Sequence, residues 1–296
     1  MLLQLSKEDL ELAYEEVNAL SKNKLENQFY KNLTISDCNY ERLTYLQSAF
    51  KILDEFPLCK SFKFEKINID KEEMFKYVDE LKSKGAKVSL DNPEKIFSIV
   101  NFNNRLLKCE LIHSNKKEFR KRNPKSRPGF HPGACKPDFA KVLVNLSGVK
   151  QSNEILDPFC GTGGILIEAQ FMNIKAFGSD IDFEMLEKAK TNLEHYKLET
   201  NLEQKDALNI DKKVDAIVTE IPFGTTTRIH GLNAKDLVKK FIENINEKNL
   251  TQKIVIGLPN KIKFEFPKFE VKLEHEVYIH KSLSKIIVVL EKTKQI

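Results

Sequence analysis

The feature that most constrains this chain is an alternation of short apolar strands and amphipathic helices along its second half. The patterns read strand, helix, strand, helix, strand, helix, strand at 154–157, 164–172, 175–180, 183–196, 214–219, 234–247 and 253–258. Such alternation predicts a parallel sheet with helices on both faces. Two last strand patterns, 272–280 and 285–291, lie close enough to form an antiparallel hairpin at one edge. The second half is therefore expected to have an α/β fold.

The first 115 residues follow a different pattern, in which short strands mix with two helices. Apolar residues recur every three or four positions over 10–20, which predicts an amphipathic helix with the cap box Ser6-Lys7-Glu8-Asp9. A second helix is predicted at 71–82, with Gly85 as its stop. Strand patterns follow at 87–90, 95–100 and 106–112. The segment 41–53 fits a strand or a helix, and the whole region predicts a small α+β module or a pair of them.

Composition excludes several classes of protein. With 41% apolar and 31% charged residues, a chain of 296 residues buries real cores and suits two or three compact units. The longest apolar run, 286–290, is far shorter than the ~20 residues that span a bilayer, and the amino end lacks a signal-peptide core. The five cysteines show no CxxC spacing, which excludes a disulfide scaffold and a local zinc knuckle. We therefore expect a cytoplasmic protein with no metal site and no membrane contact.

A basic segment separates the two halves. Between Lys116 and Gly129 the chain has seven basic residues, one acidic residue and two prolines. We interpret 116–135 as a linker of strong positive potential that binds the phosphates of a nucleic acid. A solvated charged linker is the alternative. The candidate phosphate-binding residues are Lys116, Lys117, Arg120, Lys121, Arg122, Lys125 and Arg127.

The most specific motif is a glycine-rich loop that follows the first strand of the alternating region. It reads Ile-Leu-Asp-Pro-Phe-Cys-Gly-Thr-Gly-Gly over 155–164. A dinucleotide fingerprint needs a third glycine where Leu166 stands, and no Lys-Ser or Lys-Thr follows, as the phosphate loop of nucleotide triphosphatases requires. The negative charge of Asp157 at the strand end would repel a pyrophosphate and would attract a cationic ligand. S-adenosylmethionine, with its sulfonium and ammonium groups, is such a ligand.

Acidic residues also end the next two strands. Asp180 stands where a carboxylate accepts from both hydroxyls of a ribose, and Asp206 stands where an acid accepts from an adenine amino group. Most single aspartates after a strand are helix N-caps, and Asp182 is expected to be one. Three acids in register at successive strand ends are harder to explain as caps, so we interpret them as one binding site.

The strand pattern at 214–219 leads into a candidate acceptor pocket. The order Glu220-Ile221-Pro222-Phe223 offers a carboxylate and a backbone carbonyl to the protons of an amine, with Phe223 as a stacking surface for a planar ring. The alternative is a strand that leaves the sheet through a turn. Because the carboxyl ends of parallel strands meet at one edge, Glu220 is expected to lie beside Asp157.

Taken together, these motifs resemble those of Rossmann-like class I methyltransferases. More narrowly, they resemble the archaeal-type tRNA guanosine N2-methyltransferases that carry an RNA-binding THUMP domain. Three further stretches are similar to that family, namely Arg-Pro-Gly-Phe-His-Pro-Gly at 127–133, Ala-Lys-Val-Leu-Val-Asn-Leu at 140–146 and Tyr-Ile-His-Lys-Ser-Leu-Ser-Lys at 278–285. The resemblance is strong from about residue 127 to the end and weaker before it.

This resemblance implies a domain organisation and a set of site residues. Residues 1–115 would form a ferredoxin-like and THUMP RNA-binding region, 116–135 a basic RNA-binding linker, and 136–296 a Rossmann-like methyltransferase domain. Glu220, Pro222 and Phe223 would form the acceptor pocket. The cofactor-binding residues would be Phe130, His131, Pro132, Asp157, Pro158, Phe159, Gly161, Thr162, Gly163, Asp180, Ile181, Asp206 and Ala207.

The implied function is S-adenosylmethionine-dependent methylation of the exocyclic N2 of a guanosine in tRNA, at position 10. The implied partners are tRNA and a small zinc-binding activator protein that covers an apolar edge. One alternative is the same chemistry at another tRNA site or on adenine N6. Another is a catalytically weak RNA-binding protein of the THUMP type, because the family usually has Asp where this chain has Glu220. A nicotinamide oxidoreductase is disfavoured by Leu166.

Overall fold

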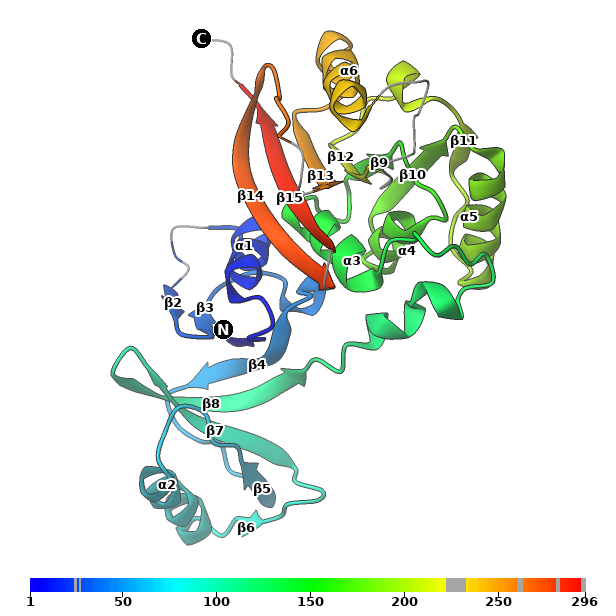
Figure 1. Ribbon diagram of the computed structural model, residues 1–296. Coiled ribbons are helices and arrows are strands. Elements are labelled where there is room, and N and C mark those ends of the chain that lie inside the picture. Colours follow the sequence, from blue (N-terminus) through cyan, green and yellow to red (C-terminus); the bar gives the residue numbers. More distant parts are fainter. Residues whose placement is uncertain (24–25, 27, 222–232, 260–262, 281–282, 294–296) are drawn as a thin grey trace. The chain divides into compact units, whose positions relative to one another are not determined.

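The chain forms two compact units, Met1–Lys116 and Lys117–Ile296 (Figure 1). The computed structural model describes residues 1–293 except 24–25, 27, 222–232, 260–262 and 281–282. The first unit ends at Lys116, one residue later than the first domain expected from the sequence, 1–115.

The first unit is built on a sheet of eight strands, in the order β2-β3-β1-β4-β8-β7-β5-β6. Its elements are β1 (Leu2–Leu5), α1 (Leu10–Leu20), β2 (Gln28–Tyr30), β3 (Leu33–Ile35), β4 (Leu46–Leu53), β5 (Ser61–Phe64), α2 (Lys71–Ser83), β6 (Lys87–Val88), β7 (Lys95–Phe102) and β8 (Arg105–Ser114). The predicted helices and strands are confirmed, and the ambiguous segment 41–53 is a strand from Leu46 on. The N-cap of α1 is Asp9, whose side chain accepts from the N–H of Leu12. The unit is α+β, and its identity as a THUMP region stays a prediction.

The second unit contains a seven-stranded sheet with the order β11-β10-β9-β12-β13-β15-β14. Its elements are α3 (Pro137–Leu146), β9 (Glu154–Asp157), α4 (Gly164–Phe171), β10 (Lys175–Asp180), α5 (Phe183–His195), β11 (Leu202–Gln204), β12 (Ala216–Glu220), α6 (Ala234–Glu247), β13 (Lys253–Pro259), β14 (Phe269–His280) and β15 (Leu283–Lys292). Strands β9 to β13 are parallel, and β15 pairs antiparallel with β13 and β14. The predicted parallel sheet and edge hairpin are both confirmed.

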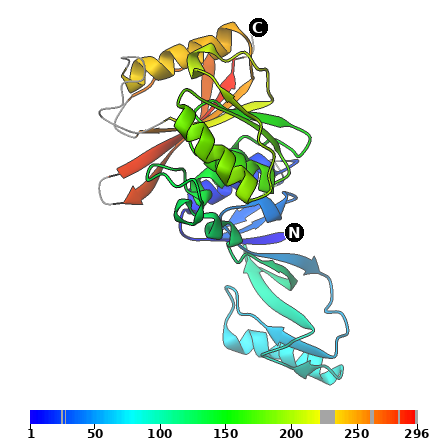
Figure 2. The same ribbon diagram turned by 90° about the vertical axis from the view of Figure 1, so that its right-hand side faces the viewer.

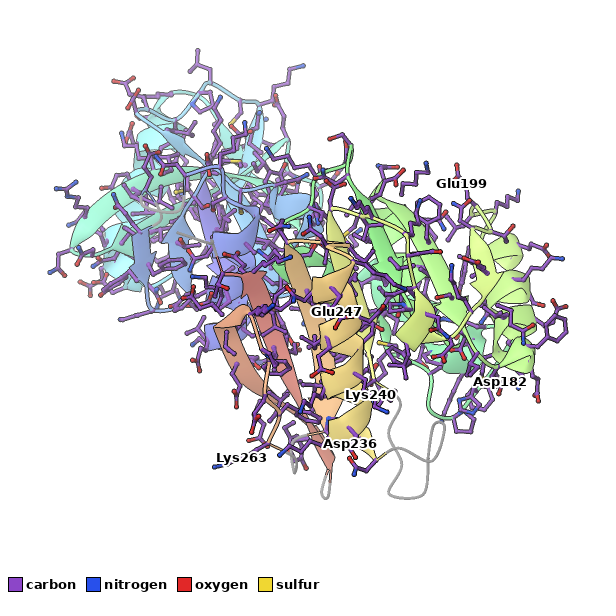
Figure 3. The ribbon with its side chains drawn as sticks, turned by 90° about the horizontal axis from the view of Figure 1, so that it is seen from above. Asp182, Glu199, Asp236, Lys240, Glu247 and Lys263 are labelled. Atoms are coloured by element: carbon purple, nitrogen blue, oxygen red, sulfur yellow. The ribbon has the colours of Figure 1, made fainter. Side chains whose placement is uncertain are left out.

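The strand order reverses between β9 and β12, and this reversal decides where the helices lie. Right-handed crossovers then place α4 and α5 on one face of the sheet and α6 on the other (Figure 2). On α6, Leu237, Phe241 and Ile245 are buried against the sheet. Figure 3 shows Asp236, Lys240 and Glu247 along the opposite, exposed side of the same helix. Such a reversal is the point at the carboxyl edge of an open α/β sheet where ligands bind.

Most of the basic segment belongs to the second unit. Residues Glu118–Arg122 and Pro124–Ser126 form two short 3₁₀ helices, in which Phe119 and Pro124 are buried. From Lys117 on, the segment that the sequence analysis interprets as a linker is therefore part of the second unit. Helix α3 follows it, in a stretch to which the sequence pattern assigns no element, and every residue of α3 from Pro137 to Leu146 except Asp138 is buried.

Candidate active site

A cavity of about 660 Å³ lies at the carboxyl ends of β9, β10 and β12. This is the volume of a small-molecule site, at the position where open α/β sheets bind ligands. Most of the predicted cofactor-binding residues line it, namely His131, Pro132, Asp157, Pro158, Phe159, Gly161, Thr162, Asp180, Ile181, Asp206 and Ala207. Glu220 lines the same cavity. Gly163 and Phe130 do not line it, and Phe130 is 45% exposed.

The glycine loop joins β9 to α4 through two residues with left-handed backbone. Gly161 has a φ of 49° and Gly163 a φ of 81°, conformations that a side chain rarely tolerates. The N–H of Gly163 donates to the carbonyl of Cys160 over 2.8 Å, which closes the turn. A Cβ added at Gly178 on β10 would lie only 2.5 Å from Cδ1 of Leu166. Leu166 therefore fills the space that the missing side chain of Gly178 leaves. The residue that breaks the dinucleotide fingerprint therefore packs α4 against the sheet.

Asp157 is the most buried acid of the cavity, with 2% of its surface exposed. Its Oδ1 accepts from the hydroxyl of Thr219 over 2.6 Å and from the N–H of Phe159 over 3.3 Å. Burial raises the pKa of Asp157 to about 7. The two hydrogen bonds lower this pKa, and the negative charges of Asp180 and Glu220 raise it further. A cation in the cavity would reverse this effect, so Asp157 is suited to a positively charged ligand.

Asp180 and Asp206 line the cavity from the ends of β10 and β11. The Oδ2 of Asp180 accepts from the N–H of Gly161 over 2.9 Å, and its Oδ1 accepts from the N–H of Asp182 over 3.0 Å. Burial raises the pKa of Asp180 above its usual value. Asp206 caps a short 3₁₀ helix through the N–H of Leu208, and Asp182 is the N-cap of α5, as predicted. Asp206 is thus a cap that also faces the cavity.

Glu220 lines the cavity in an ion pair with Lys285 from β15. Cys135 also lines the cavity, and burial followed by the charge of Glu220 raises the pKa of its thiol. A thiol held neutral in this way is a poor nucleophile, and the same holds for the buried Cys160. Pro222 and Phe223, the other two predicted acceptor residues, lie outside the described residues.

The loop that carries His131 and Pro132 is tied to the site by one buried amide. The side chain of Asn192 on α5 accepts from the N–H of Gly129 over 2.7 Å and donates to the carbonyls of Gly129 and Thr162. A Cβ at Gly129 would lie 2.5 Å from the carbonyl oxygen of Lys188, so the loop meets α5 directly there. Asn192 therefore joins the 127–133 loop, the glycine loop and α5.

Replacing Asn192 by Ala is expected to lower the free energy of unfolding by about 2–4 kcal/mol, because three backbone groups lose their partner in a buried place. Urea denaturation measures this change. Gln252→Ala is the control, because Gln252 is exposed and bonds only one side chain, Asn249, among the described contacts. Equal, small changes in both variants would contradict the role of Asn192.

The predicted RNA-binding residues divide into two groups. Arg127 is 3% exposed, and Arg122 pairs with Glu168 over 2.6 Å in the interior of the second unit. Arg127 is therefore buried, whereas 16% of the Arg122 side chain stays exposed beside its ion pair. The others lie at the surface or partly exposed, namely Lys116, Lys117, Arg120, Lys121 and Lys125. Arg120 pairs there with Asp138, and Lys121 with Glu118.

Several residues of the cavity carry no assignment from the sequence. Lys285 and Phe139 come from elements far from the glycine loop in the chain, and Met185 projects from α5. One signal for Lys285 is visible in the sequence, since a lysine opens an otherwise apolar strand at 285–290. The approach of Phe139 depends on the packing of α3, which no local pattern indicates.

Comparison with solved structures identifies the fold. The crystal structure of TrmN from Thermus thermophilus superposes with a TM-score of 0.54 at 19% identity over 99% of each chain. The structure of SMU.472 complexed with SAH gives a TM-score of 0.52 at 14% identity, over 99% of this chain and 98% of that one. A family model described as "RMKL-like, methyltransferase domain" matches residues 124–266, and one described as "DNA methylase" matches residues 3–191. The fold and the acidic cavity define a Rossmann-like class I methyltransferase.

Sequence relatives identify the family within this class. The chain is 38% identical over 218 residues to the tRNA (guanine(10)-N2)-dimethyltransferase of Methanothermobacter thermautotrophicus, and 34% identical over 257 residues to that of Methanocaldococcus jannaschii. It belongs to the family of archaeal tRNA (guanine(10)-N2)-dimethyltransferases. The first match covers 70% of this chain and the second 79%. The chain spans 64% of the length of the first relative and 71% of the second. In the described part of the chain, every helix is too short or too polar to cross a membrane.

Proposed function

We propose that this chain methylates the exocyclic N2 of a guanosine in tRNA, at position 10, with S-adenosylmethionine as the methyl donor. The observation that carries the proposal is the single cavity in which Asp157, Asp180, Asp206 and Glu220 meet. Two relatives with which this chain shares its family are named for this reaction. The proposed tRNA substrate implies a cytoplasmic protein.

The residues around the cavity fit S-adenosylmethionine by their chemistry. Asp157 would bind the ammonium group, because a buried carboxylate gains most from a neighbouring cation. Each oxygen of Asp180 accepts from one backbone N–H and keeps a lone pair for a ribose hydroxyl. Asp206 would accept from the adenine amino group. A ligand with a pyrophosphate would instead place its negative charges against these same carboxylates.

Glu220 is the residue that would act on the acceptor. When bound, S-adenosylmethionine supplies an electrophilic methyl group on a positively charged sulfur. The lone pair of guanine N2 is delocalised into the ring, so the amine must be held with that lone pair turned toward the donor. Glu220 and the carbonyl of Ile221 would accept the two amine protons and fix this orientation. The proton released on transfer would pass to Glu220 or to water.

The binding of tRNA would use exposed cations and the first unit. Lys116, Arg120, Lys121 and Lys125 would contact phosphates, which gives sequence-independent affinity that falls with salt. The guanosine must leave its stack to reach the cavity, at a cost of a few kcal/mol that this binding offsets. The expected activator protein would cover the edge strand β14, where Val271 and Tyr278 are exposed. Activity of the purified chain alone would show that no activator is needed.

Incubation of the protein with labelled S-adenosylmethionine and total tRNA from a strain lacking the gene tests the proposal. Label is expected in N2-methylated guanosine, and a transcript with guanosine 10 replaced by adenosine should lose it. Label in N6-methyladenosine, or at another guanosine, would replace the proposed target with the corresponding alternative. Binding of the donor with no transfer would support the RNA-binding alternative and overturn the proposal.

The affinity for S-adenosylmethionine is expected to rise with pH because of Asp157. Burial raises the pKa of Asp157 to about 7 in the absence of a ligand, and the cationic donor binds the ionised form. The ionised fraction therefore rises from about one tenth at pH 6 to about nine tenths at pH 8, and the affinity rises about tenfold. Isothermal titration calorimetry between pH 6 and 8 measures this dependence.

Two variants separate Asp157 from other titrating groups. Asp157→Asn should bind weakly with a flat profile over this range. Thr219→Val removes the hydroxyl that donates to the ionised carboxylate, so its profile should move to higher pH. A wild-type profile that stays flat from pH 6 to 8 would contradict the assigned role.

A further inference from the structure

We infer that Lys285 is the positioning residue of the acceptor site, where it holds the carboxylate of Glu220 in one orientation. The inference rests on the proposed function, because it concerns how the acceptor amine is held. The two side chains form an ion pair, with 13% of Lys285 and 10% of Glu220 exposed. Lys285 also lines the cavity. A buried ion pair of this kind adds little to the stability of the fold, because desolvation of the two charges offsets their attraction. It does hold the two side chains in one defined geometry.

The ion pair reaches across three strands of the sheet. Glu220 lies on β12 and Lys285 on β15, and β13 runs between them. On β13, Gly257 is opposite Glu220, and Pro259 is opposite Lys285. The two charged residues therefore meet above a strand whose nearest position carries no side chain.

Gly257 provides the space in which this contact forms. A Cβ built on Gly257 would lie 2.9 Å from Cε1 of Phe139 and 3.4 Å from Cγ of Glu220. The ring of Phe139 from α3 thus occupies the place above the glycine, and its centroid lies 4.8 Å from Nζ of Lys285. Phe139 is itself buried, so its ring forms a fixed wall beside the ion pair. Such an arrangement limits the rotamers of both charged side chains.

The acceptor site needs such a constraint for two physical reasons. The side chain of Glu220 has three rotatable bonds, so without a partner it would populate several orientations. Asp157 lies in the same cavity, and its negative charge would turn an unpaired carboxylate away. The ammonium of Lys285 occupies Oε1 and balances the charge. The thiol of Cys135 also hydrogen-bonds the Glu220 carboxylate. A carboxylate oxygen has two lone pairs, so Oε2 would still accept from the amine of guanine.

Lys285→Met tests the inference, because methionine keeps much of the length and removes the charge. The kcat for methyl transfer to tRNA is expected to fall about 10²-fold, the effect of misplacing an acceptor by about 1 Å. The KM for tRNA and the Kd for S-adenosylmethionine should change less than threefold. Lys285→Arg, which restores the cation, should recover most of the activity.

The matched control is Lys253→Met. Lys253 on β13 pairs with Glu291 on β15 over 3.3 Å, so this variant also removes an ion pair between strands of the same sheet, at the end away from the cavity. It should leave kcat unchanged. Equal losses in the two variants, or a kcat within threefold of wild type in Lys285→Met, would overturn the inference while the proposed function stands.

A second measurement does not depend on activity. Carbon-13 NMR at a single pH compares the Glu220 carboxyl signal, assigned by its absence in Glu220→Gln, in the wild type and in Lys285→Met. Loss of the ion pair should shift and broaden this signal, because the carboxylate then populates several orientations. An unchanged signal would overturn the inference even if the wild-type protein transferred no methyl group, an outcome that would by itself refute the proposed function.

Discussion

Replacing Glu220 by Gln is expected to lower the rate of methyl transfer to tRNA about 10³-fold, within the range that a positioned acid–base group contributes. Glutamine has the same shape and no charge, so it neither balances Lys285 nor takes up a proton from the amine. Binding of S-adenosylmethionine should change less than threefold, because the proposed donor-binding residues Asp157 and Asp180 are unchanged in this variant. Single-turnover kinetics with saturating donor measure the transfer step separately from binding.

The companion variant Glu220→Asp separates charge from length. Aspartate keeps the charge and is usual in the family, but it is one methylene shorter and reaches less far toward Lys285. A gain in rate would show that the longer side chain limits the wild-type protein, and a loss would show that the pair with Lys285 has become necessary. If Glu220→Gln transferred methyl groups at the wild-type rate, Glu220 could not be the acceptor-binding residue.

Arg122→Ala is expected to lower the free energy of unfolding by about 3–5 kcal/mol, because it leaves a buried carboxylate without its partner. Arg122 donates to both oxygens of Glu168, whose side chain is 1% exposed, and its guanidinium lies 4.0 Å from the ring centroid of Phe171. The change removes both contacts and strands the charge of Glu168 inside the second unit. Urea denaturation at constant salt measures the loss.

Lys121→Ala is the matched control for this prediction. Lys121 lies next to Arg122 and pairs with Glu118 at the surface, so its loss should cost no more than about 1 kcal/mol. Lys121→Ala should instead weaken tRNA binding and reduce its dependence on salt. The reverse result, in which Arg122→Ala weakens tRNA binding and leaves stability unchanged, would restore Arg122 to the RNA-binding set.

The sequence predicts most of the second unit because its elements depend on local patterns. The strand at 175–180 and the helix at 234–247 each have a period that one short window contains. The acids at 157, 180 and 206 are predictable as a group for the same reason, since parallel strands bring their carboxyl ends to one edge. The structure bears out this reasoning by placing all three around one cavity.

Contacts between distant segments are not predictable in this way. Arg122 and Arg127 belong to a run of basic residues, yet tertiary packing turns both inward, and Glu168 receives one of them from 46 positions away. Lys285 meets Glu220 across 65 positions and an intervening strand. Helix α3 is buried on nearly all sides, and this includes Lys141 and Asn145 of its polar stripe, so the pattern of its sequence does not indicate how it packs. In each case the decisive neighbour lies outside any sequence window.

The absence of a side chain at Gly257 links the evolution of this position to that of Phe139. A methyl group there would lie 2.9 Å from the ring of Phe139, which is too close, but only in van der Waals contact with Glu220, at 3.4 Å. A relative that acquires alanine at this position should therefore carry a smaller residue in place of Phe139. The two substitutions should be inherited together, so that ancestral sequences change at both sites within the same branch.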